Sequence, residues 1–233
     1  DAYLRRALGR DIDVEWVGVS VWTRRGVVAE RYSEGPVHLL GDAVHQLSPT
    51  GALGMNTGIA DAVDLSWKLA AVIEGWGGDA LLASYDAQPR RIGERKVRAA
   101  TGYFQGHRDF ERGVGTIEDA TAEGDEIRKR LGEQLLRDIA RMFRTSGVQL
   151  GYHYDPSPIC VLDGTPPPAD EPEVYVPTAR PGARAPHVWL DDGRSTLDLF
   201  GRGFVLLRLG PESPDASALA KGAAQRRSGG GLA

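Results

Sequence analysis

The sequence predicts an α/β fold with long helices, and three observations point to it. A short run of mostly apolar residues, 37–40, is typical of a strand and ends in Gly-Asp. A loop with one proline and several glycines follows it, and a helix then runs from about Asn56 to Glu74. Apolar strands that do not alternate usually lie inside a parallel sheet that is covered on both faces. We therefore expect 37–40 to be a buried strand with parallel neighbours.

Two elements are predicted before this strand. The first ten residues form a short helix, and the segment from Asp13 to Trp22 forms a strand rich in valine and tryptophan. In that strand Val17, Val19 and Val21 share one face, since successive side chains of a strand point to opposite faces. Residues 24–35 are a polar connection to the second strand.

The helix predicted after the glycine loop has one apolar stripe. Its members recur at spacings of three and four residues, which is the pattern of one helix face, and glycines at 75, 77 and 78 end the helix. The stripe consists of Ile59, Ala62, Leu65, Leu69 and Val72. We expect these five residues to face the core.

Two further helices precede a region of different composition. Residues 79–105 are helical with a bend or break at Pro89, and a second amphipathic helix runs from about Asp125 to Phe143. After residue 150 the chain is rich in proline and glycine, which predicts loops with short strands at 187–190 and 204–210. The low-complexity end, 221–233, is expected to be disordered.

Composition narrows the class of protein. The 233 residues carry a formal net charge of −4, which gives no reason to expect nucleic acid or an anionic membrane as a partner. No apolar run approaches the roughly 20 residues of a membrane-spanning helix, and the first residues lack a signal-peptide core. The only cysteine, Cys160, cannot form an internal disulfide, and the histidines lack metal-ligand spacing. We expect a cytoplasmic protein without a metal.

The glycine loop has the chemistry of a ligand site. Gly41 allows a sharp turn, and Asp42 then lies at the carboxyl end of the strand, where an aspartate commonly accepts hydrogen bonds from sugar hydroxyls. Gly51 and Gly54 permit close approach of the backbone to a flat ligand. Gly54 also begins the helix with Met55 and Asn56, whose N–H groups lack intrahelical partners and favour negative charge.

The whole stretch 35–75 resembles the second FAD-binding motif of the para-hydroxybenzoate hydroxylase-like, single-component flavin-dependent aromatic hydroxylases. Residues 81–91 are similar to the segment that follows that motif in the family. Residues 150–160 and 194–210 resemble the C-terminal region of the branch that hydroxylates polycyclic polyketides. The resemblance implies a partial FAD-binding, Rossmann-like domain (1–100), a helical connection (101–150) and a partial thioredoxin-like domain with a disordered tail (151–233).

The resemblance also implies roles for individual residues. Asp42 would bind the ribityl chain of FAD, with Gly41 beside it in the cofactor-binding turn, and Pro49 would lie near the reactive edge of the flavin ring. The amides around Gly54, Met55 and Asn56 would face the ring carbonyl region that becomes negative on reduction, and Gly51 is counted among the cofactor-binding residues because it allows close backbone approach. NAD(P)H would be the reductant, O2 the oxidant and an aromatic polycycle the substrate. No side chain is assigned as catalytic, because the cofactor carries the chemistry.

The sequence departs from the family pattern in two places. The family's loop usually has two adjacent glycines and a glutamine before the last glycine, where this chain has Ala52 and Leu53. The order of residues around "AQPRR" differs too, so no role is transferred there. Within the motif, His45 is interpreted as a structural hydrogen-bonder, with an acid-base role as the alternative. Trp67 is interpreted as a packing residue rather than a flavin stack.

Parts of the family pattern are absent from these residues. There is no G-x-G-x-x-G turn for the ADP half of FAD, so the chain resembles the C-terminal portion of a longer enzyme. We therefore expect weak or no FAD binding by the chain alone, and a companion N-terminal half or self-association to supply the missing strands. Two alternatives stay open: a non-catalytic binding module, and a flavin enzyme that epoxidises or performs Baeyer–Villiger oxidation.

Overall fold

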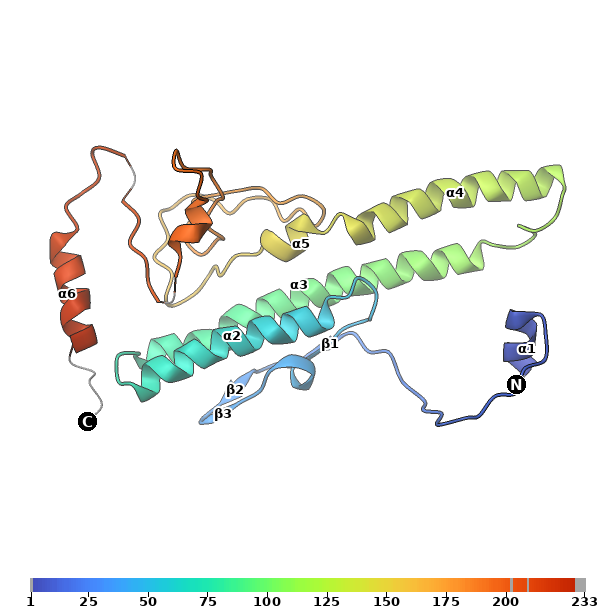
Figure 1. The fold of residues 1–233 in the computed structure, drawn as a ribbon, viewed down its shortest axis with the longest axis horizontal. Coiled ribbons are helices and arrows are strands. Elements are labelled where there is room, and N and C mark those ends of the chain that lie inside the picture. The colour runs from blue at the N-terminus through green and yellow to red at the C-terminus, as the bar shows by residue number, and fades with distance from the viewer. Residues whose placement is uncertain (1, 202, 209, 229–233) are drawn as a thin grey trace.

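The computed structural model describes residues 2–201, 203–208 and 210–228. Two long helices lie side by side, and a third long helix runs back along the outer half of the second (Figure 1). Short strands lie against the helix pair on the opposite side. The elements in chain order are α1 Ala2–Leu8, β1 Val27–Val28, β2 Ser33–Glu34, β3 Val37–His38, the 3-10 turn η1 Gly41–Ala43, β4 His45–Gln46, α2 Gly54–Ile73, α3 Asp79–Arg112, α4 Ala122–Phe143, α5 Ser146–Leu150, the 3-10 turn η2 Thr196–Leu199 and α6 Ser217–Ser228.

The predicted helices are confirmed. The short N-terminal helix is α1, and the helix after the glycine loop is α2, which begins at Gly54. The expected break at Pro89 is wrong, since α3 runs through it without interruption. Pro89 is buried in the middle of α3, between the buried residues Tyr85 and Ile92, and this packing offsets the lost N–H. The boundary predicted at residue 100 falls inside α3.

The prediction of a buried strand at 37–40 is wrong. Residues 37 and 38 form β3, which pairs antiparallel with β2, with Ser33 opposite His38. The second ladder is equally small and antiparallel, and it joins β1 to β4. Val37 is 58% exposed and Leu39 is 43% exposed. In the part of the chain that is described, no parallel strand lies beside 37–40. The apolar side chains of this segment are therefore not buried inside a sheet.

The strand predicted from Asp13 to Trp22 does not form either. This segment is extended but belongs to no ladder among residues 2–201, and Val17, Val19 and Val21 are 99%, 82% and 98% exposed. In Figure 1 it runs away from the helix pair toward α1. A strand is stable only when its N–H and C=O groups pair with a neighbour. The sequence alternates as a strand does, but among the described residues no neighbouring strand pairs with this segment.

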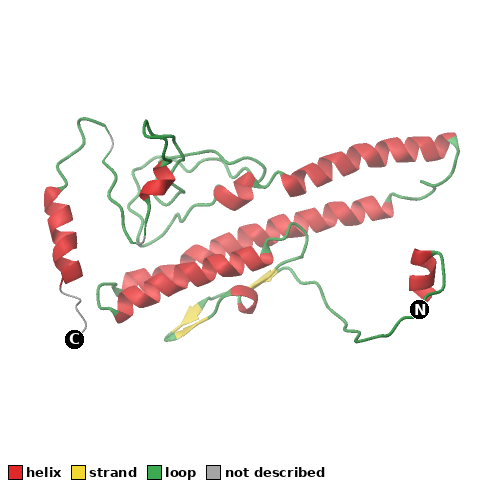
Figure 2. Cartoon of the chain, in the orientation of Figure 1, coloured by secondary structure: helices red, strands yellow, loops and turns green. Residues whose placement is uncertain are grey.

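The C-terminal region is mostly irregular, as Figure 2 shows. The strands predicted at 187–190 and 204–210 are absent from the described residues, where only single bridges join His153 to Ala183 and Trp189 to Ser195. A thioredoxin-like sheet is therefore not confirmed for the described residues after 150. The tail predicted as disordered is helical as far as Ser228 in α6, and 229–233 lie outside the described residues.

Two small clusters form the core. The first gathers Tyr32, Val44, Leu65 and Tyr85, so it joins the β region to α2 and α3. The second gathers Leu53, Ala100 and Val148, so it joins the glycine loop to α3 and α5. Both clusters lie around the loop that was singled out in the sequence. The loop is therefore held on two sides by apolar packing.

The buried face of α2 is more polar than predicted. Its buried positions are Thr57, Asp61, Leu65, Lys68 and Ala71, which recur at spacings of three and four. Of the predicted stripe, Leu65 is buried and Leu69 and Val72 are half-buried, whereas Ile59 is 55% exposed and Ala62 is exposed. The periodicity identified the helix correctly but did not place its buried face, because the side that packs on α3 carries a charged network.

Candidate functional site

The turn that carries Asp42 is tight and leaves its carboxylate open. Gly41 adopts a φ of +60°, in the left-handed region that glycine tolerates, and the backbone closes from the Val44 amide to the Gly41 carbonyl at 3.0 Å. Asp42 is exposed and has no hydrogen-bond partner among the described residues. An unpaired carboxylate on a rigid turn can accept two hydrogen bonds from neighbouring hydroxyl groups.

The loop after this turn is shaped by contacts with α3. A β-carbon on Gly51, whose φ is +88°, would lie 2.8 Å from a ring carbon of Tyr103, so only glycine fits there. The residue therefore serves close packing within the chain, which the sequence did not predict. Pro49 is exposed, and its carbonyl accepts from the Ala52 amide at 3.1 Å. Pro49 thus projects from the tip of a fixed turn.

Ala52 and Leu53, the departures from the family pattern, have different structural roles. Ala52 has a φ of +53°, which places an alanine in the left-handed region. Leu53 is only 3% exposed and packs with Ala100 and Val148. The leucine therefore anchors the end of the loop to α3 and α5, directly before α2 begins.

The N-terminus of α2 presents unpaired backbone donors. Its N-cap, Leu53, supplies no side-chain hydrogen bond, and the first turn contains no acidic residue. Met55 is 76% exposed, and the Asn56 amide group donates back to the Ala52 carbonyl at 3.1 Å. Gly54 is half-buried, and a β-carbon there would meet nothing within 4 Å. The end is suited to negative charge or a polarised carbonyl.

The structure brings the Asp42 turn and the start of α2 together. A β-carbon on Gly58 would lie 3.3 Å from the Cα of Gly41, so the two backbones touch one helical turn after Gly54. The exposed Asp42 therefore lies on a turn that packs against the first two turns of α2. Gly51 and Pro49 lie on the loop that connects them along the chain.

A buried polar pair lies directly beneath the turn. Oδ2 of Asp61 accepts from the Gly41 amide at 3.0 Å and from Nε2 of His45 at 2.6 Å. His45 is 0% exposed and Asp61 is 2% exposed. The interpretation of His45 as a structural hydrogen-bonder is confirmed. Asp61 was not singled out in the sequence, although its spacing of four residues from both Thr57 and Leu65 places it on their face.

A second charged pair lies further along the same face of α2. Nζ of Lys68 donates to Oδ2 of Asp64 at 2.6 Å and to Oε1 of Gln88 on α3 at 2.7 Å. Burial lowers the pKa of Lys68, and the Asp64 charge partly offsets this. Burial likewise raises the pKa of the Asp64 carboxyl, against the hydrogen bond from Lys68. These groups hold α2 on α3 and are too deep to meet a ligand.

The basic run at 90–98 is largely used for internal contacts. Arg91 donates to the Asp155 carbonyl at 2.6 Å, and Arg95 pairs with Asp170 at 2.6 Å and with the Val148 carbonyl at 2.9 Å. Lys96 is buried, which lowers its pKa, while the nearby Asp61 charge raises it. This run thus ties the segment at 148–170 to α3.

One cavity lies away from the loop. It has a volume of about 860 Å³ and lies between α3, α4 and the 170–173 segment, and none of residues 41–56 lines it. Its charges balance, with arginines at 95, 98, 137 and 141 facing acids at 109, 138, 170 and 173. Two of these arginines are already engaged, Arg95 with Asp170 and Arg141 with Glu173. The cavity has no net preference for an anion.

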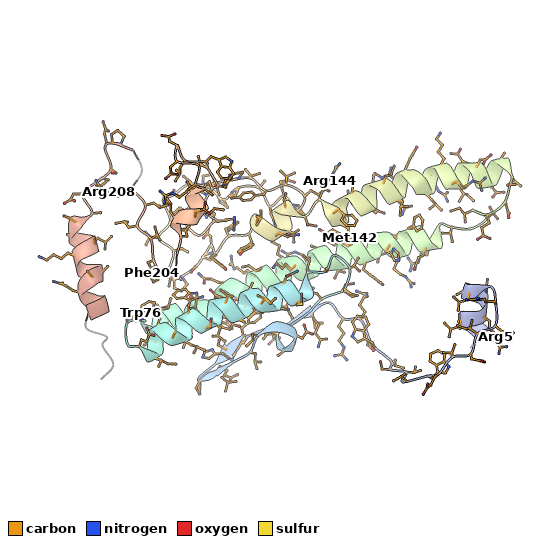
Figure 3. The ribbon with its side chains drawn as sticks, in the orientation of Figure 1. Arg5, Trp76, Met142, Arg144, Phe204 and Arg208 are labelled. Atoms are coloured by element: carbon orange, nitrogen blue, oxygen red, sulfur yellow. The ribbon has the colours of Figure 1, made fainter. Side chains whose placement is uncertain are left out.

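Three further features of the described residues concern metal ligation, membrane spanning and the packing of Trp67. These residues contain no group of three or more metal-ligating side chains, and no helix formed by them is long and apolar enough to cross a membrane. Trp67 packs edge-on against Phe204 at 6.0 Å between ring centroids, which confirms it as a packing residue. Trp76 meets the same ring at 5.9 Å, and Figure 3 shows Trp76 and Phe204 close together.

Comparison with known proteins shows that the chain is similar to FAD-binding proteins. Residues 2–100 match the family described as FAD binding domain. The chain is 39% identical over 212 residues to the FAD-dependent monooxygenase opdD of Penicillium oxalicum, covering 87% of the chain and 40% of that protein. It is also 39% identical to a putative polyketide hydroxylase of Streptomyces halstedii, covering 88% of the chain and 34% of that protein.

Solved structures give the same result. The chain is 40% identical to the rebeccamycin biosynthetic enzyme RebC with reduced flavin, with a TM-score of 0.78, covering 97% of this chain and 42% of that one. It is 35% identical to the flavin-dependent monooxygenase PieE in complex with FAD and substrate, with a TM-score of 0.73, covering 86% of this chain and 38% of that one. The chain thus spans roughly two fifths of the length of these relatives or less.

Proposed function

We propose that this chain forms the ribityl- and ring-facing part of an FAD-dependent monooxygenase. Its match to the FAD binding domain family at residues 2–100 and its similarity to an FAD-dependent monooxygenase and a putative polyketide hydroxylase support this proposal. One observation carries the proposal. The turn with the open carboxylate of Asp42 packs on the start of α2, whose first amides lack intrahelical partners. A sugar-like chain and an electron-rich ring would find complementary groups on this turn and helix start.

The residues present fit FAD in their chemistry. Asp42 would accept hydrogen bonds from ribityl hydroxyls, and Pro49 would lie at the edge of the flavin ring. The amides of Gly54, Met55 and Asn56 would face the ring carbonyls, where reduction adds negative charge. FAD, when bound, would take reducing equivalents from NAD(P)H and activate O2 for transfer to the substrate. The chain's own part is to bind, orient and stabilise charge.

The proposed substrate is an aromatic polycycle of polyketide type. This class is supported by relatives named as polyketide hydroxylase and aklavinone 12-hydroxylase, the latter 35% identical over 192 residues. A structure of aklavinone-11 hydroxylase with FAD and aklavinone is similar too, with a TM-score of 0.53 and 30% identity. We propose hydroxylation as the reaction, with NADH or NADPH as the donor.

We further propose that a companion polypeptide covers the outer face of α2 and the extended N-terminal segment. Met55, Ile59 and Val63 recur every four residues along α2 and are 76%, 55% and 63% exposed. Val17 and Val21 are almost fully exposed on a segment whose alternation suits a sheet. The occupant would carry strands and the G-x-G-x-x-G turn for the ADP half of FAD.

Equilibrium dialysis with FAD tests the function and the companion together. We expect the chain alone to bind FAD weakly or not at all, and to bind it stoichiometrically when co-expressed with the part of RebC that the chain does not match. Tight, stoichiometric FAD on the isolated chain would overturn the companion proposal. A well-folded isolated chain that light scattering shows as a monomer would argue against self-association. No FAD in the co-expressed complex would favour a non-catalytic binding module.

A matched pair of variants tests the site itself. Asp42→Ala should weaken FAD binding by about tenfold or more, the scale of a hydrogen bond to a charged group. Glu30→Ala removes an exposed acid of the same region and should leave the affinity unchanged. Equal affinities of the two variants would contradict the role of Asp42. Product analysis with an aromatic polycycle separates hydroxylation from epoxidation or Baeyer–Villiger oxidation.

A further inference from the structure

A single buried carboxylate reaches both sides of the turn that carries Asp42. Oδ2 of Asp61 accepts the Gly41 amide at 3.0 Å on one side of Asp42, and it accepts Nε2 of His45 at 2.6 Å on the other. The 3-10 turn Gly41–Ala43 begins at the first of these donors, and the second donor, His45, follows two residues after the turn ends. One oxygen atom of α2 therefore holds the chain in place both before and after Asp42.

This carboxylate lies where a helix would ordinarily bury an apolar residue. Asp61 shares its face of α2 with Leu65, and both pack inward at 2% and 6% exposed. Burying a carboxylate is unfavourable unless its oxygens receive strong hydrogen bonds, and both donors here come from the candidate site. The chain thus keeps in its core a carboxyl group whose hydrogen-bond partners, the Gly41 amide and the His45 ring, flank Asp42.

The same helix also carries the other half of the site. Asp61 lies two turns after Gly54, on the helix whose first amides lack intrahelical partners. The Gly41 and Gly58 backbones touch between these two points. A rigid α2 therefore transmits the position of its N-terminus to the Asp42 turn through the Asp61 carboxylate.

We propose that Asp61 and His45 are positioning residues that hold Asp42 in a fixed relation to the N-terminus of α2. This inference rests on the proposed FAD site, since it concerns the alignment of that site's two halves. Neither side chain is placed in contact with the cofactor, because both are buried beneath the turn. They act on FAD binding indirectly, by fixing the backbone position of Gly41 and of the residues that follow it.

The first arm of the test needs no cofactor. Hydrogen exchange is measured on the full chain, comparing Asp61→Ala, Asp61→Asn and the control Asp64→Asn. Asp61→Ala should speed exchange of the Gly41 amide by about tenfold. Asp61→Asn should largely preserve protection, because one amide oxygen can replace the single oxygen that accepts both donors. Asp64→Asn removes a neighbouring carboxylate that pairs with Lys68 and should leave the turn unchanged.

The second arm measures FAD affinity in the co-expressed complex. Asp61→Ala should lose affinity by about the same factor as its loss of protection, and Asp61→Asn should restore most of it. Loss of affinity on Asp42→Ala without any loss on Asp61→Ala would overturn the positioning role and leave the FAD site intact. An unchanged FAD affinity in Asp42→Ala would instead overturn the proposed FAD site. The hydrogen-exchange result would still test whether Asp61 holds the Gly41 turn.

Global unfolding is detected separately. Faster exchange of the α3 amides around Ala100 would show that Asp61→Ala has unfolded the chain. In that case His45→Ala and His45→Gln are compared, since glutamine keeps a donor nitrogen in reach of Asp61. Faster exchange at residues 44–46 in His45→Ala, restored in His45→Gln, supports the inference. Equal exchange in wild type and both variants overturns it.

Discussion

Tyr85→Phe is expected to destabilise the protein, whereas Tyr32→Phe is not. Both side chains are 0% exposed, and both belong to the cluster that joins the β region to α2 and α3. The hydroxyl of Tyr85 donates to the Leu39 carbonyl at 2.8 Å. The hydroxyl of Tyr32 is buried without a hydrogen-bond partner among the described residues. The same atom is therefore removed from two similar environments that differ in one hydrogen bond.

The magnitude follows from the surroundings of each hydroxyl. A net hydrogen bond contributes about 0.5–1.5 kcal/mol, and a carbonyl left buried without a partner costs more. Leu39 is 43% exposed, so water can reach its carbonyl and the loss in Tyr85→Phe should be about 1 kcal/mol. Removing the unpaired hydroxyl of Tyr32 should be neutral or stabilise by up to about 1 kcal/mol.

Urea denaturation followed by circular dichroism measures both variants. Burial raises the pKa of both phenols, so each is a neutral donor at the pH of the measurement. For a chain of this size, about 1 kcal/mol corresponds to about 2–4 °C in Tm, which a thermal scan can resolve. Equal losses in the two variants, at unchanged denaturant slope, would refute the reasoning. The slope matters because a change in it would signal an altered unfolded state.

Four further substitutions test other parts of the fold by the same denaturation assay. Ala52→Gly should stabilise by up to about 1 kcal/mol, because the φ of +53° strains alanine; a loss would mean that the loop relies on its methyl group. Burial raises the pKa of Asp64 above its usual 3.8, so the native state binds more protons than the unfolded chain between these values. Wild type should therefore lose stability relative to Asp64→Asn as pH rises from 3.8 through the raised pKa; a constant difference would contradict this. Gly147→Ala should disrupt the packing of α5, since its β-carbon would lie 1.7 Å from the Glu171 carbonyl oxygen, whereas Gly132→Ala in α4 meets nothing within 4 Å and should stabilise by up to about 1 kcal/mol. The opposite order of these two glycine variants would argue against the placement of α5.

The helices and the loop between them were predictable because their signals are local. Periodic apolar residues and terminal glycines identified α2 with its start displaced by only two residues, and α4 was found from its amphipathic pattern. The continuity of α3 through Pro89 was not predictable, since it depends on what packs around the proline. The antiparallel pairing of 37–38 was missed for the same reason: an apolar tetrapeptide does not specify its neighbour.

The candidate site divides in the same way. The sequence by itself determined that a Gly-Asp turn, a proline and a glycine-rich helix start occur in one 16-residue stretch, 41–56, because these residues have fixed backbone and charge properties. Only the tertiary structure decided that Asp61 reaches back to Gly41 and His45, that Gly51 packs on Tyr103, and that Ile59 faces outward. These are contacts between segments far apart in the chain or choices between helix faces. Periodicity cannot make such choices, since it reports that a face exists and not which groups will cover it.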